Sequence, residues 1–449
     1  MKENLLHVTP LPPARNGIAD YASILLDNVQ AHTNSLVLSD TVGAVAPRGI
    51  RVVALEAAEP KHFKGRLPVY QIGNNWQHTE MLRMALKRPG LVVLHDLHLF
   101  YLYESLGLNS GEMTDLASRS NPFVSHAFAT RLSAKATTPK LPYMLANMTA
   151  DLVSASKRIL VHSRYARNLI ERHLGEVVAD RVDVVPHFAI PSTPRDRDQT
   201  RRRLGVDSDR FLIVTAGFAT KAKQLDMLAQ ALAPLVRQDR RYLWIHAGSA
   251  GDEYYNLASM LKEYPEVSAV TRITGYLSES ALDDHLAAAD LLINLRFPSV
   301  GESSGSLARA LTSGVCALVT DTGGYSEYPS DAVLKLGLLD THRTLGALIK
   351  VIADNDDLRT KVGLNARAYA ETRLSMDSYI DGFMTAVTRA KAAKTVEPRR
   401  ADAVVSDWVG PLEQLGSAFN LFGAGERSEV DFVRNPSSRE PGIYVRRRT

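Results

Sequence analysis

The chain has 449 residues, more than one ordinary domain, and this length predicts roughly two to four folding units. Apolar residues make up 45% and charged residues 23%, values near the average for globular proteins, which excludes fibrous folds and wholesale disorder. The formal net charge is +4, from 53 basic and 49 acidic residues spread along the chain. A mild, dispersed excess of this kind argues against nucleic acid as a partner.

The cysteine content and the lengths of the apolar runs indicate the cellular compartment of the protein. Cys316 is the single cysteine, so an intrachain disulfide and a Cys-based metal cluster are excluded, and we expect a buried thiol in a reducing compartment. Met1 to Val8 reads as a strand rather than a secretory signal. No run reaches the roughly 18 apolar residues of a membrane-spanning helix. We therefore expect a cytoplasmic protein. Peripheral contact with the inner face of the membrane is a minor hypothesis, based on Arg164, Arg167 and Arg172.

Short apolar runs alternate with helical patterns along the chain. Those in the first 190 residues are LLHVTPL, NSLVLSD, IRVVAL, VYQIG, LVVLHD, RILVHS and VDVVPH. After the turn-prone stretch IPSTPRDRDQTRRR the series restarts with FLIVTAG, YLWIHAG, AVTRITG, LLINL, CALVTD and AVLKL. Helix-period segments at 225–236, 278–289 and 345–353 separate several of these runs. Alternating strands and helices predict two α/β domains, each with a parallel sheet covered on both faces.

Breaks in this series of strands and helices predict the domain boundaries. We expect an N-terminal Rossmann-like domain over residues 1–193, a C-terminal one over 194–375, and a helix over 376–395 that returns to the N-terminal domain. Residues 396–449 lack periodicity, and we expect a tail that is largely disordered.

The segment RFPSVGESSGSLARALTSG, which runs from a strand into a helix, gives the best functional signal. Gly301, Ser303, Ser304 and Gly305 supply small side chains and backbone N–H groups at a helix N-terminus, where hydrogen bonds and the helix dipole attract phosphate. A plain capped helix with Ser303 or Ser304 as N-cap explains the same residues. This segment alone therefore leaves a diphosphate site and a structural cap open.

The first strand of the C-terminal domain ends in Gly217, and Lys221 and Lys223 lie in the loop that follows. Ligands of open α/β sheets bind at the carboxyl ends of strands. A lysine there can neutralise a diphosphate as a metal ion does elsewhere. Two solvated loop lysines are the alternative.

Polar residues also follow the strands of the N-terminal domain. Gly17 follows the first strand and lets backbone approach a ligand. The others are Asp20, Asn74, His78, His95 and Asp96. Because all fall on one sheet edge, they predict a cleft, although a structural role is the ordinary alternative for any one histidine. Downstream, LVTDTGGYSEYP places Glu327 where it either contacts a ligand or caps a helix.

Seven motifs in order carry a resemblance that spans about residues 1 to 390. They are PLPPxxxGIADYxxxL, GNNxxH, VVLHDLHLF, VHSRYAR, VVPH, GFATKxKQLD and GESSGxLARALxxGxxxLVTDxGGYSEYP. Together they resemble the bacterial family-4 retaining glycosyltransferases of GT-B architecture. The resemblance implies two Rossmann-like domains facing across a cleft. It further implies a nucleotide-sugar donor on the C-terminal domain, a glycan or lipid-linked acceptor on the N-terminal domain, and no metal or other cofactor.

The resemblance also implies roles for single residues. Lys223 resembles the lysine on the donor diphosphate, and Gly17 the glycine near the same phosphates. His95 resembles the histidine beside the transferred sugar, and Gly301 to Gly305, with Glu302, the loop on sugar and phosphate. We therefore predict His95, Lys223 and Glu302 as catalytic. Donor contacts are predicted for Gly17, Gly217, Lys221, Gly301, Ser303, Ser304, Gly305 and Arg309, acceptor contacts for Asp20, Asn74, His78 and Asp96, and no metal ligand.

Two departures from the family pattern set a second hypothesis beside the first. The usual pair of glutamates is replaced by Gly301 and Arg309, with Glu302 displaced by one position, and an arginine cannot accept hydrogen bonds from a ribose. The basic residue expected after Gly217 is Phe218. We therefore retain, beside an active transferase, a nucleotide-binding or scaffold protein that has lost turnover. A dinucleotide oxidoreductase is disfavoured because no GxGxxG follows a strand.

Overall fold

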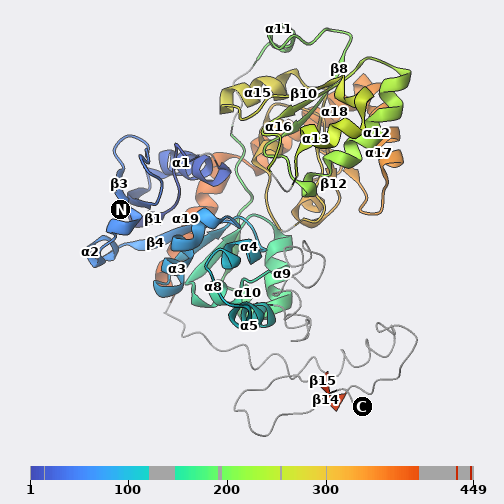
Figure 1. Cartoon of the computed structure of the whole chain (residues 1–449). Coiled ribbons are helices and arrows are strands. Elements are labelled where there is room, and N and C mark those ends of the chain that lie inside the picture. The colour runs from blue at the N-terminus through green and yellow to red at the C-terminus, as the bar shows by residue number, and fades with distance from the viewer. Residues whose placement is uncertain are drawn as a thin grey trace. The chain divides into compact units, whose positions relative to one another are not determined.

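The computed structural model describes residues 2–14, 16–120, 147–190, 195–252, 255–299, 301–393, 431–432 and 445–446 (Figure 1). The chain divides into two compact units. The first comprises Met1–Val161, Ala166–Asp183 and Thr385–Thr449, and the second comprises His162–Tyr165 and Val184–Met384. The longer segment of the second unit runs from Val184 to Met384. The predicted disordered tail lies outside the described residues, apart from the antiparallel pair β14 (Asp431–Phe432) and β15 (Val445–Arg446).

The first unit contains a seven-stranded sheet in the order β3-β2-β1-β4-β5-β6-β7. The strands are β1 (Glu3–Val8), β2 (Thr33–Ser39), β3 (Arg51–Ala54), β4 (Leu67–Ile72), β5 (Leu91–Leu94), β6 (Arg158–Val161) and β7 (Val182–Val184). The pairs from β3 through β6 are parallel, and β4 and β5 are buried along their whole length. Every apolar run predicted as a strand in this half of the chain is confirmed, because parallel strands covered on both faces must be almost continuously apolar.

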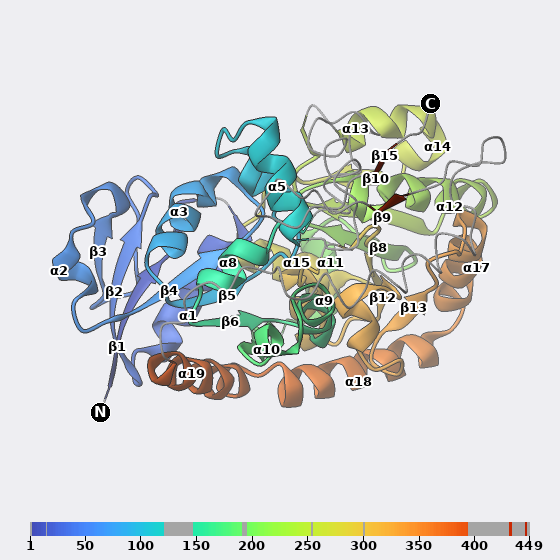
Figure 2. The ribbon, with the colours of Figure 1, turned by 90° about the horizontal axis from the view of Figure 1, so that it is seen from below.

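Helices and 3-10 turns connect these strands. They are α1 (Gly17–Val29), η1 (Leu55–Ala57), α2 (Pro60–Phe63), η2 (Trp76–His78), α3 (Thr79–Lys87), α4 (Phe100–Glu104), α5 (Ser110–Ser120), α8 (Ala150–Ala155), α9 (Arg164–Leu174) and α10 (Glu176–Ala179). Helices α3 and α8 lie side by side, with α3 against β4 (Figure 2). Helix α1 buries Ala22 and Leu26 against Val37 of β2.

The second unit contains a six-stranded parallel sheet in the order β10-β9-β8-β11-β12-β13. Its strands are β8 (Phe211–Ala216), β9 (Tyr242–Ala247), β10 (Thr271–Ile273), β11 (Leu291–Asn294), β12 (Ala317–Thr320) and β13 (Leu334–Leu336). All six predicted strands are confirmed. The order is that of a doubly wound, Rossmann-like sheet, in which the direction of winding reverses between β8 and β11.

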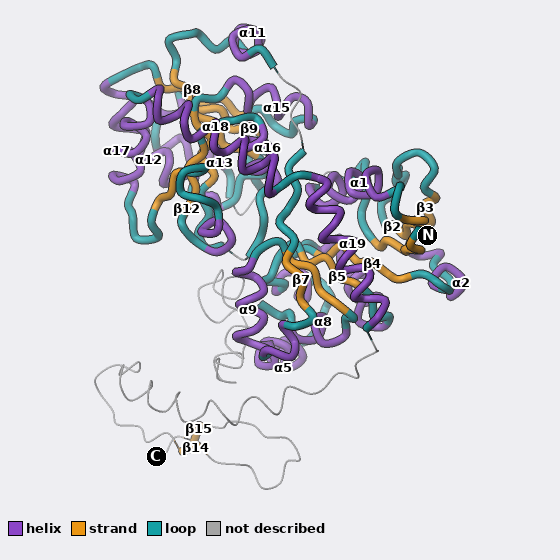
Figure 3. Tube along the Cα trace, turned by 180° about the vertical axis from the view of Figure 1, so that it is seen from behind, coloured by secondary structure: helices purple, strands orange, loops and turns teal. Residues whose placement is uncertain are grey.

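The two faces of this second sheet bury alternate residues of the same strands. Ile213 and Trp244 face one core together with α12 and α17, whereas Val214 and Ile245 face the other together with α15 and α16, and α18 contributes to both cores. Figure 3 shows these helices around the strands of the sheet. The helices and turns are α11 (Arg197–Arg203), η3 (Lys221–Lys223), α12 (Leu225–Gln238), α13 (Leu257–Met260), η4 (Leu261–Glu263), α14 (Pro265–Ser268), α15 (Glu279–Ala288), α16 (Gly305–Thr312), η5 (Gly323–Glu327), α17 (His342–Ala353) and α18 (Asp356–Arg373).

Helix α19 (Met376–Ala392) begins in the second unit and continues into the first from Thr385 onward. There Arg389 donates to Asp183 Oδ1 at 2.6 Å. Asp183 also accepts from Arg158, at 2.6 Å from Nε and 2.9 Å from Nη2. The Asp183 side chain is 6% exposed, so one buried carboxylate holds the end of the sheet and the last helix together.

Among the described residues, no helix is long and apolar enough to cross a membrane.

Replacing Asp183 tests this attachment. We expect Asp183→Asn to lower the free energy of unfolding by about 3 kcal/mol, because it leaves the largely buried guanidinium of Arg158 without its anion. Urea unfolding of the full chain measures the change. Glu59→Gln is the matched control, since Glu59 pairs with Lys61 through exposed side chains and such pairs contribute little to stability. Equal losses in the two variants would contradict the assignment.

Candidate functional site

The reversal of winding in the second sheet brings two of the predicted loops together. Strands β8 and β11 are direct neighbours, with Leu291 in register with Ile213, and their connections continue into separate helices. Loops that follow such a pair leave room for a ligand beyond the strand ends. The loop after β8 carries Lys223, and the loop after β11 leads to Gly305. The backbone N–H of Phe297 donates to Ala222 O at 2.8 Å and joins the two loops.

Lys223 lies directly over the end of β8. Its Nζ donates to Ala216 O at 2.5 Å, and a Cβ added to Gly217 would lie 2.8 Å from that nitrogen. Gly217 has φ +83, a conformation that glycine adopts without strain. Burial lowers the pKa of the Lys223 ammonium well below its usual value, and the positive charge of Arg296 lowers it further. Lys221, in contrast, is exposed and forms an ion pair with Asp226.

The loop after β11 ends in a capped helix. Ser304 is the N-cap of α16: its Oγ accepts from Leu307 N at 3.2 Å and donates to Asn294 Oδ1 at 3.1 Å. Of the two serines considered, Ser304 is therefore the cap, and Ser303 lies partly buried before it. Gly301 has φ +79, and Gly305 begins the helix with an exposed backbone position. The first N–H groups of a helix are those that an anion can use.

Glu302 is held by three donors. Ser299 Oγ donates to its Oε2 at 3.2 Å, Tyr325 OH donates to its Oε1 at 3.3 Å, and Arg296 Nε lies 3.3 Å from the same oxygen. Burial, with the Glu302 charge as a smaller cause, raises the pKa of the Tyr325 phenol well above its usual value, so it remains a donor. Sequence reasoning missed Arg296, although its position directly after the strand LLINL was a usable signal.

Arg309 of α16 is engaged by a neighbouring helix. Its side chain is buried, and its guanidinium bonds Glu279 at 2.7 Å and Asp283 at 3.0 Å, both on α15. Within the described residues, no hydrogen bond or ion pair joins it to Lys223 or Glu302.

Glu327 is a helix cap. Its carboxylate accepts from Arg164 N at 3.1 Å and from Tyr165 N at 2.7 Å, in the first turn of α9. Of the two roles that the sequence left open for Glu327, the structure confirms capping.

The first unit has a corresponding reversal of winding between β1 and β4. Gly17 opens α1 after β1, and a Cβ there would meet nothing within 4 Å. The preceding Asn16 caps α1 through Ala19 N at 2.8 Å. Its Nδ2 donates to Gln77 Oε1 at 2.9 Å, which joins this loop to the loop after β4. Asp20 lies partly buried in the first turn of α1.

The two predicted histidines at this sheet edge are buried to different degrees. His95 Nε2 bonds Gln71 Oε1 at 2.7 Å, and the edge of the Tyr21 ring lies against it, with centroids 4.6 Å apart. His78 is fully buried and bonds Gln71 O through Nδ1 at 2.9 Å. Burial lowers the pKa of His78 to about 4, so its ring is neutral at physiological pH. His78 therefore lies beneath the edge, and His95 lies nearer to its surface.

Asp96 and Asn74 connect the loops after β4 and β5. Asn74 N donates to Asp96 Oδ2 at 2.7 Å, and Leu102 N donates to Asn74 Oδ1 at 3.0 Å. These bonds fix the edge of the first sheet where acceptor contacts are predicted. In the described part of the chain, no group of three or more His, Cys, Asp or Glu residues is placed to hold a metal ion.

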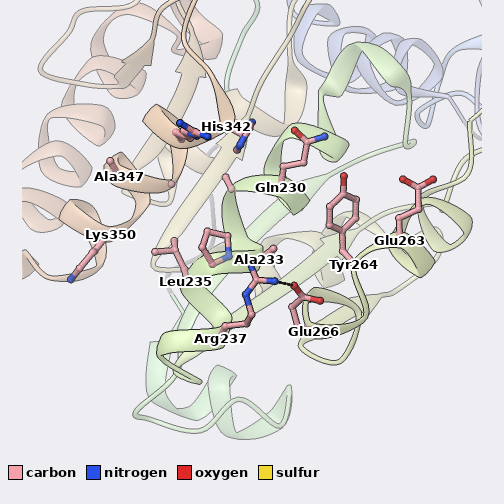
Figure 4. A pocket seen from close by; sticks show the side chains of 14 residues that line it. Gln230, Ala233, Leu235, Arg237, Glu263, Tyr264, Glu266, His342, Ala347 and Lys350 are labelled. Carbon is pink, nitrogen blue, oxygen red and sulfur yellow. Dashed lines mark hydrogen bonds and ion pairs between the residues drawn. The ribbon is translucent and has the colours of Figure 1, made fainter.

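A separate hollow of about 700 Å³ lies on α12, η4, α14 and α17 (Figure 4). Arg237 and Glu266 form an ion pair at 2.5 Å on its wall, and Lys350 lies on α17. None of the predicted site residues lines this hollow.

Comparison with known proteins identifies the second unit. Residues 196–369 match the family "Glycosyl transferases group 1". A D-inositol 3-phosphate glycosyltransferase of Gordonia bronchialis is 29% identical over 276 residues, which cover 58% of this chain and 56% of that protein. The chain thus spans about half the length of that relative.

Two solved structures show the same fold over most of the chain. Sucrose-phosphate synthase from Thermosynechococcus elongatus gives a TM-score of 0.64 at 13% identity, covering 88% of this chain and 100% of that one. Anabaena Alr3699/HepE in complex with UDP-glucose gives 0.61 at 14% identity, covering 86% and 99%. Residues 196–369 are therefore similar to the glycosyl transferases group 1 family, in a chain whose two Rossmann-like sheets have the GT-B fold.

Proposed function

We propose that this protein transfers a sugar from a nucleotide diphosphate-sugar to a glycan or lipid-linked acceptor, with retention of configuration and without a metal ion, in cell-surface polysaccharide synthesis. The observation that carries the proposal is the hydrogen bond that joins the loop carrying Lys223 to the loop leading to α16, beyond the ends of the paired strands β8 and β11. It lies inside the region that matches the glycosyltransferase family. The similar proteins include a D-inositol 3-phosphate glycosyltransferase and a structure in complex with UDP-glucose, which supports a nucleotide-sugar donor.

Transfer of the sugar releases a negatively charged nucleoside diphosphate, so the site requires a positive charge beside this leaving group. Lys223 supplies a positive charge at the end of β8, and the first turn of α16 supplies backbone donors. Groups already fixed in place stabilise developing charge without reorganising during the reaction. We assign phosphate contacts to Lys223 and to the segment from Gly301 to Gly305, and further donor contacts to Gly17, Gly217 and Lys221.

The acceptor side is assigned to the first unit. His95, held by Gln71 and Tyr21, is proposed beside the transferred sugar. Asp20, Asn74, His78 and Asp96 are proposed to form or support the acceptor edge. In this proposal the leaving phosphate takes the acceptor's proton by front-face attack, as in the family-4 enzymes that the sequence resembles, so a carboxylate pair of the glycosidase kind is not required.

One observation favours a second candidate function. Arg309 stands where the resemblance expects a glutamate, and its guanidinium is engaged by α15. A chain that binds nucleotide through Lys223 but cannot orient the ribose would serve as a nucleotide-binding or scaffold subunit. Calorimetric binding of a nucleoside diphosphate with no transfer to any acceptor would favour this function over catalysis.

We propose a cytoplasmic location, with peripheral membrane contact through Arg164, Arg167 and Arg172 of α9 when the acceptor is lipid-linked. Arg164 and Arg172 are exposed, and Arg167 pairs with Glu171. Flotation with anionic vesicles measures the contact. Protein that stays at the bottom of the gradient contradicts it.

Replacing Lys223 is the main test of the proposal. Incubated with a panel of UDP-, GDP- and ADP-sugars in EDTA, the full chain should transfer or hydrolyse at least one of them. Lys223→Ala should remove most of that activity, roughly a hundredfold, because it deletes the cation at the leaving group. Product chromatography measures both. Lys350→Ala is the control, since Lys350 is exposed and pairs with Asp354. Activity that requires added Mg²⁺, or equal activity in both variants, contradicts the proposal.

The lowered pKa of Lys223 predicts a pH-dependent affinity. Burial and the charge of Arg296 disfavour the ammonium form, whereas a bound diphosphate favours it, so the pKa of Lys223 rises on binding. Between the two pKa values the complex takes up a proton, and affinity for the nucleoside diphosphate falls as pH rises. Calorimetry in buffers of different ionisation enthalpy measures the uptake. The Lys223→Ala variant should show neither effect, and a pH dependence retained in that variant would assign it to another group.

A further inference from the structure

The loop after β8 is short of positive charge. The resemblance expects a basic residue after Gly217, but the chain has Phe218, whose side chain is 47% exposed. Lys221 is paired with Asp226. Lys223 is thus the one lysine of this loop that lies over the strand end. A diphosphate carries negative charge on both phosphates, which a single ammonium compensates incompletely.

A second cation reaches the same place from the neighbouring loop. Arg296 follows β11 directly, and its backbone N–H donates to Thr320 Oγ1 at the end of β12 at 3.0 Å. The next residue, Phe297, donates to Ala222 O in the loop that carries Lys223. The backbone of Arg296 is therefore fixed at the point where the winding reverses.

The guanidinium of Arg296 is anchored on one side. Its Nη1 donates to Leu295 O at 3.0 Å, and its Nε lies 3.3 Å from Glu302 Oε1. Among the described residues no hydrogen bond or ion pair occupies its Nη2. The side chain is 14% exposed, and its charge acts on the ammonium of Lys223. Two cations thus share one site, and the carboxylate of Glu302 offsets part of their charge.

Glu302 keeps Arg296 in place because it is itself fixed. Ser299 and Tyr325 donate to its two oxygens, so the carboxylate cannot swing away from the guanidinium without losing both bonds. With Nε beside Glu302 and Nη1 bonded to Leu295 O, the Nη2 end of the planar guanidinium is the part that can donate to a phosphate. The local excess of positive charge favours an anionic ligand.

We propose that Arg296 is a specificity-determining residue of this site: it supplies the second cation for a nucleoside diphosphate, in place of the basic residue missing after Gly217. This inference rests on the proposed function, since it assumes that a nucleotide donor binds beside Lys223. It goes further by assigning discrimination between diphosphate and monophosphate to one side chain. Lys223 provides a point charge, and Arg296 provides the directed hydrogen bonds.

Calorimetry on the full chain tests the assignment, with UDP, GDP and ADP and the corresponding monophosphates as probes. We expect Arg296→Met to weaken diphosphate binding about tenfold or more, as for a lost charge-assisted hydrogen bond, and to change monophosphate binding less than about twofold. The dependence of diphosphate affinity on NaCl should also decrease, because one charge contact is lost. Arg237→Met is the matched control, since Arg237 is 62% exposed, pairs with Glu266 on α14, and should leave both affinities unchanged.

The outcomes separate this inference from the proposed function. If no nucleotide binds the unmodified chain, both fail. If diphosphate binding depends on Lys223 but is unchanged in Arg296→Met, this inference alone fails. Equal weakening of diphosphate and monophosphate also overturns it, because that result describes a structural role. Thermal unfolding shows whether Arg296→Met folds. If it does not, Arg296→Gln, which keeps a donor toward Glu302, is judged by the same criteria.

Discussion

The reversal of winding between β8 and β11 is the constraint on which the candidate site depends. Two parallel strands that pair directly, with connections running into separate helices, leave backbone groups beyond their carboxyl ends that no helix covers. Side chains from distant parts of the sequence meet there without any local signal. The hydrogen bond from Phe297 to Ala222 fixes the spacing between the two loops, so Lys223 and Arg296 approach the same place from different strands.

Two like charges lie close together at this place. Lys223 has a lowered pKa because it is buried beside another cation, and its Nζ is stabilised by Ala216 O. Glu302 offsets part of the charge through Arg296 but is held away from free rotation by Ser299 and Tyr325. Burying one cation beside another costs stability, and strongly perturbed groups of this kind are typical of functional sites.

The proposal for the second unit and the geometry of the first unit fit one another chemically. The second unit concentrates cations and helix-end donors, which suit phosphate. The first unit places His95 and Asp96 at its sheet edge, where hydrogen-bonding groups suit a hydroxyl-rich acceptor. Arg309 departs from the pattern, and its ion pairs with Glu279 and Asp283 give it a packing role between α15 and α16. Ribose recognition, in an active enzyme, would then use other groups.

The sequence by itself determined the elements and the fold class. Strands such as FLIVTAG and LLINL are buried on both faces, so they must be continuous apolar runs, and turn residues separate them from helices with a 3.6-residue period. The same logic placed Gly217 and Gly305 at strand and helix ends. Periodicity reports burial, which is a local property, and this is why every predicted strand was found.

Only the tertiary structure decided which polar side chains meet. Lys221 and Lys223 are two residues apart, yet one pairs with Asp226 in solvent and the other lies over β8. The sequence does not distinguish the partners of Arg296 from those of Arg309. In the structure, Arg296 pairs with Glu302 at the strand ends, whereas Arg309 pairs with α15. Hydrogen-bond partners depend on the direction of a side chain and on neighbours that are distant in sequence, and a single sequence carries neither.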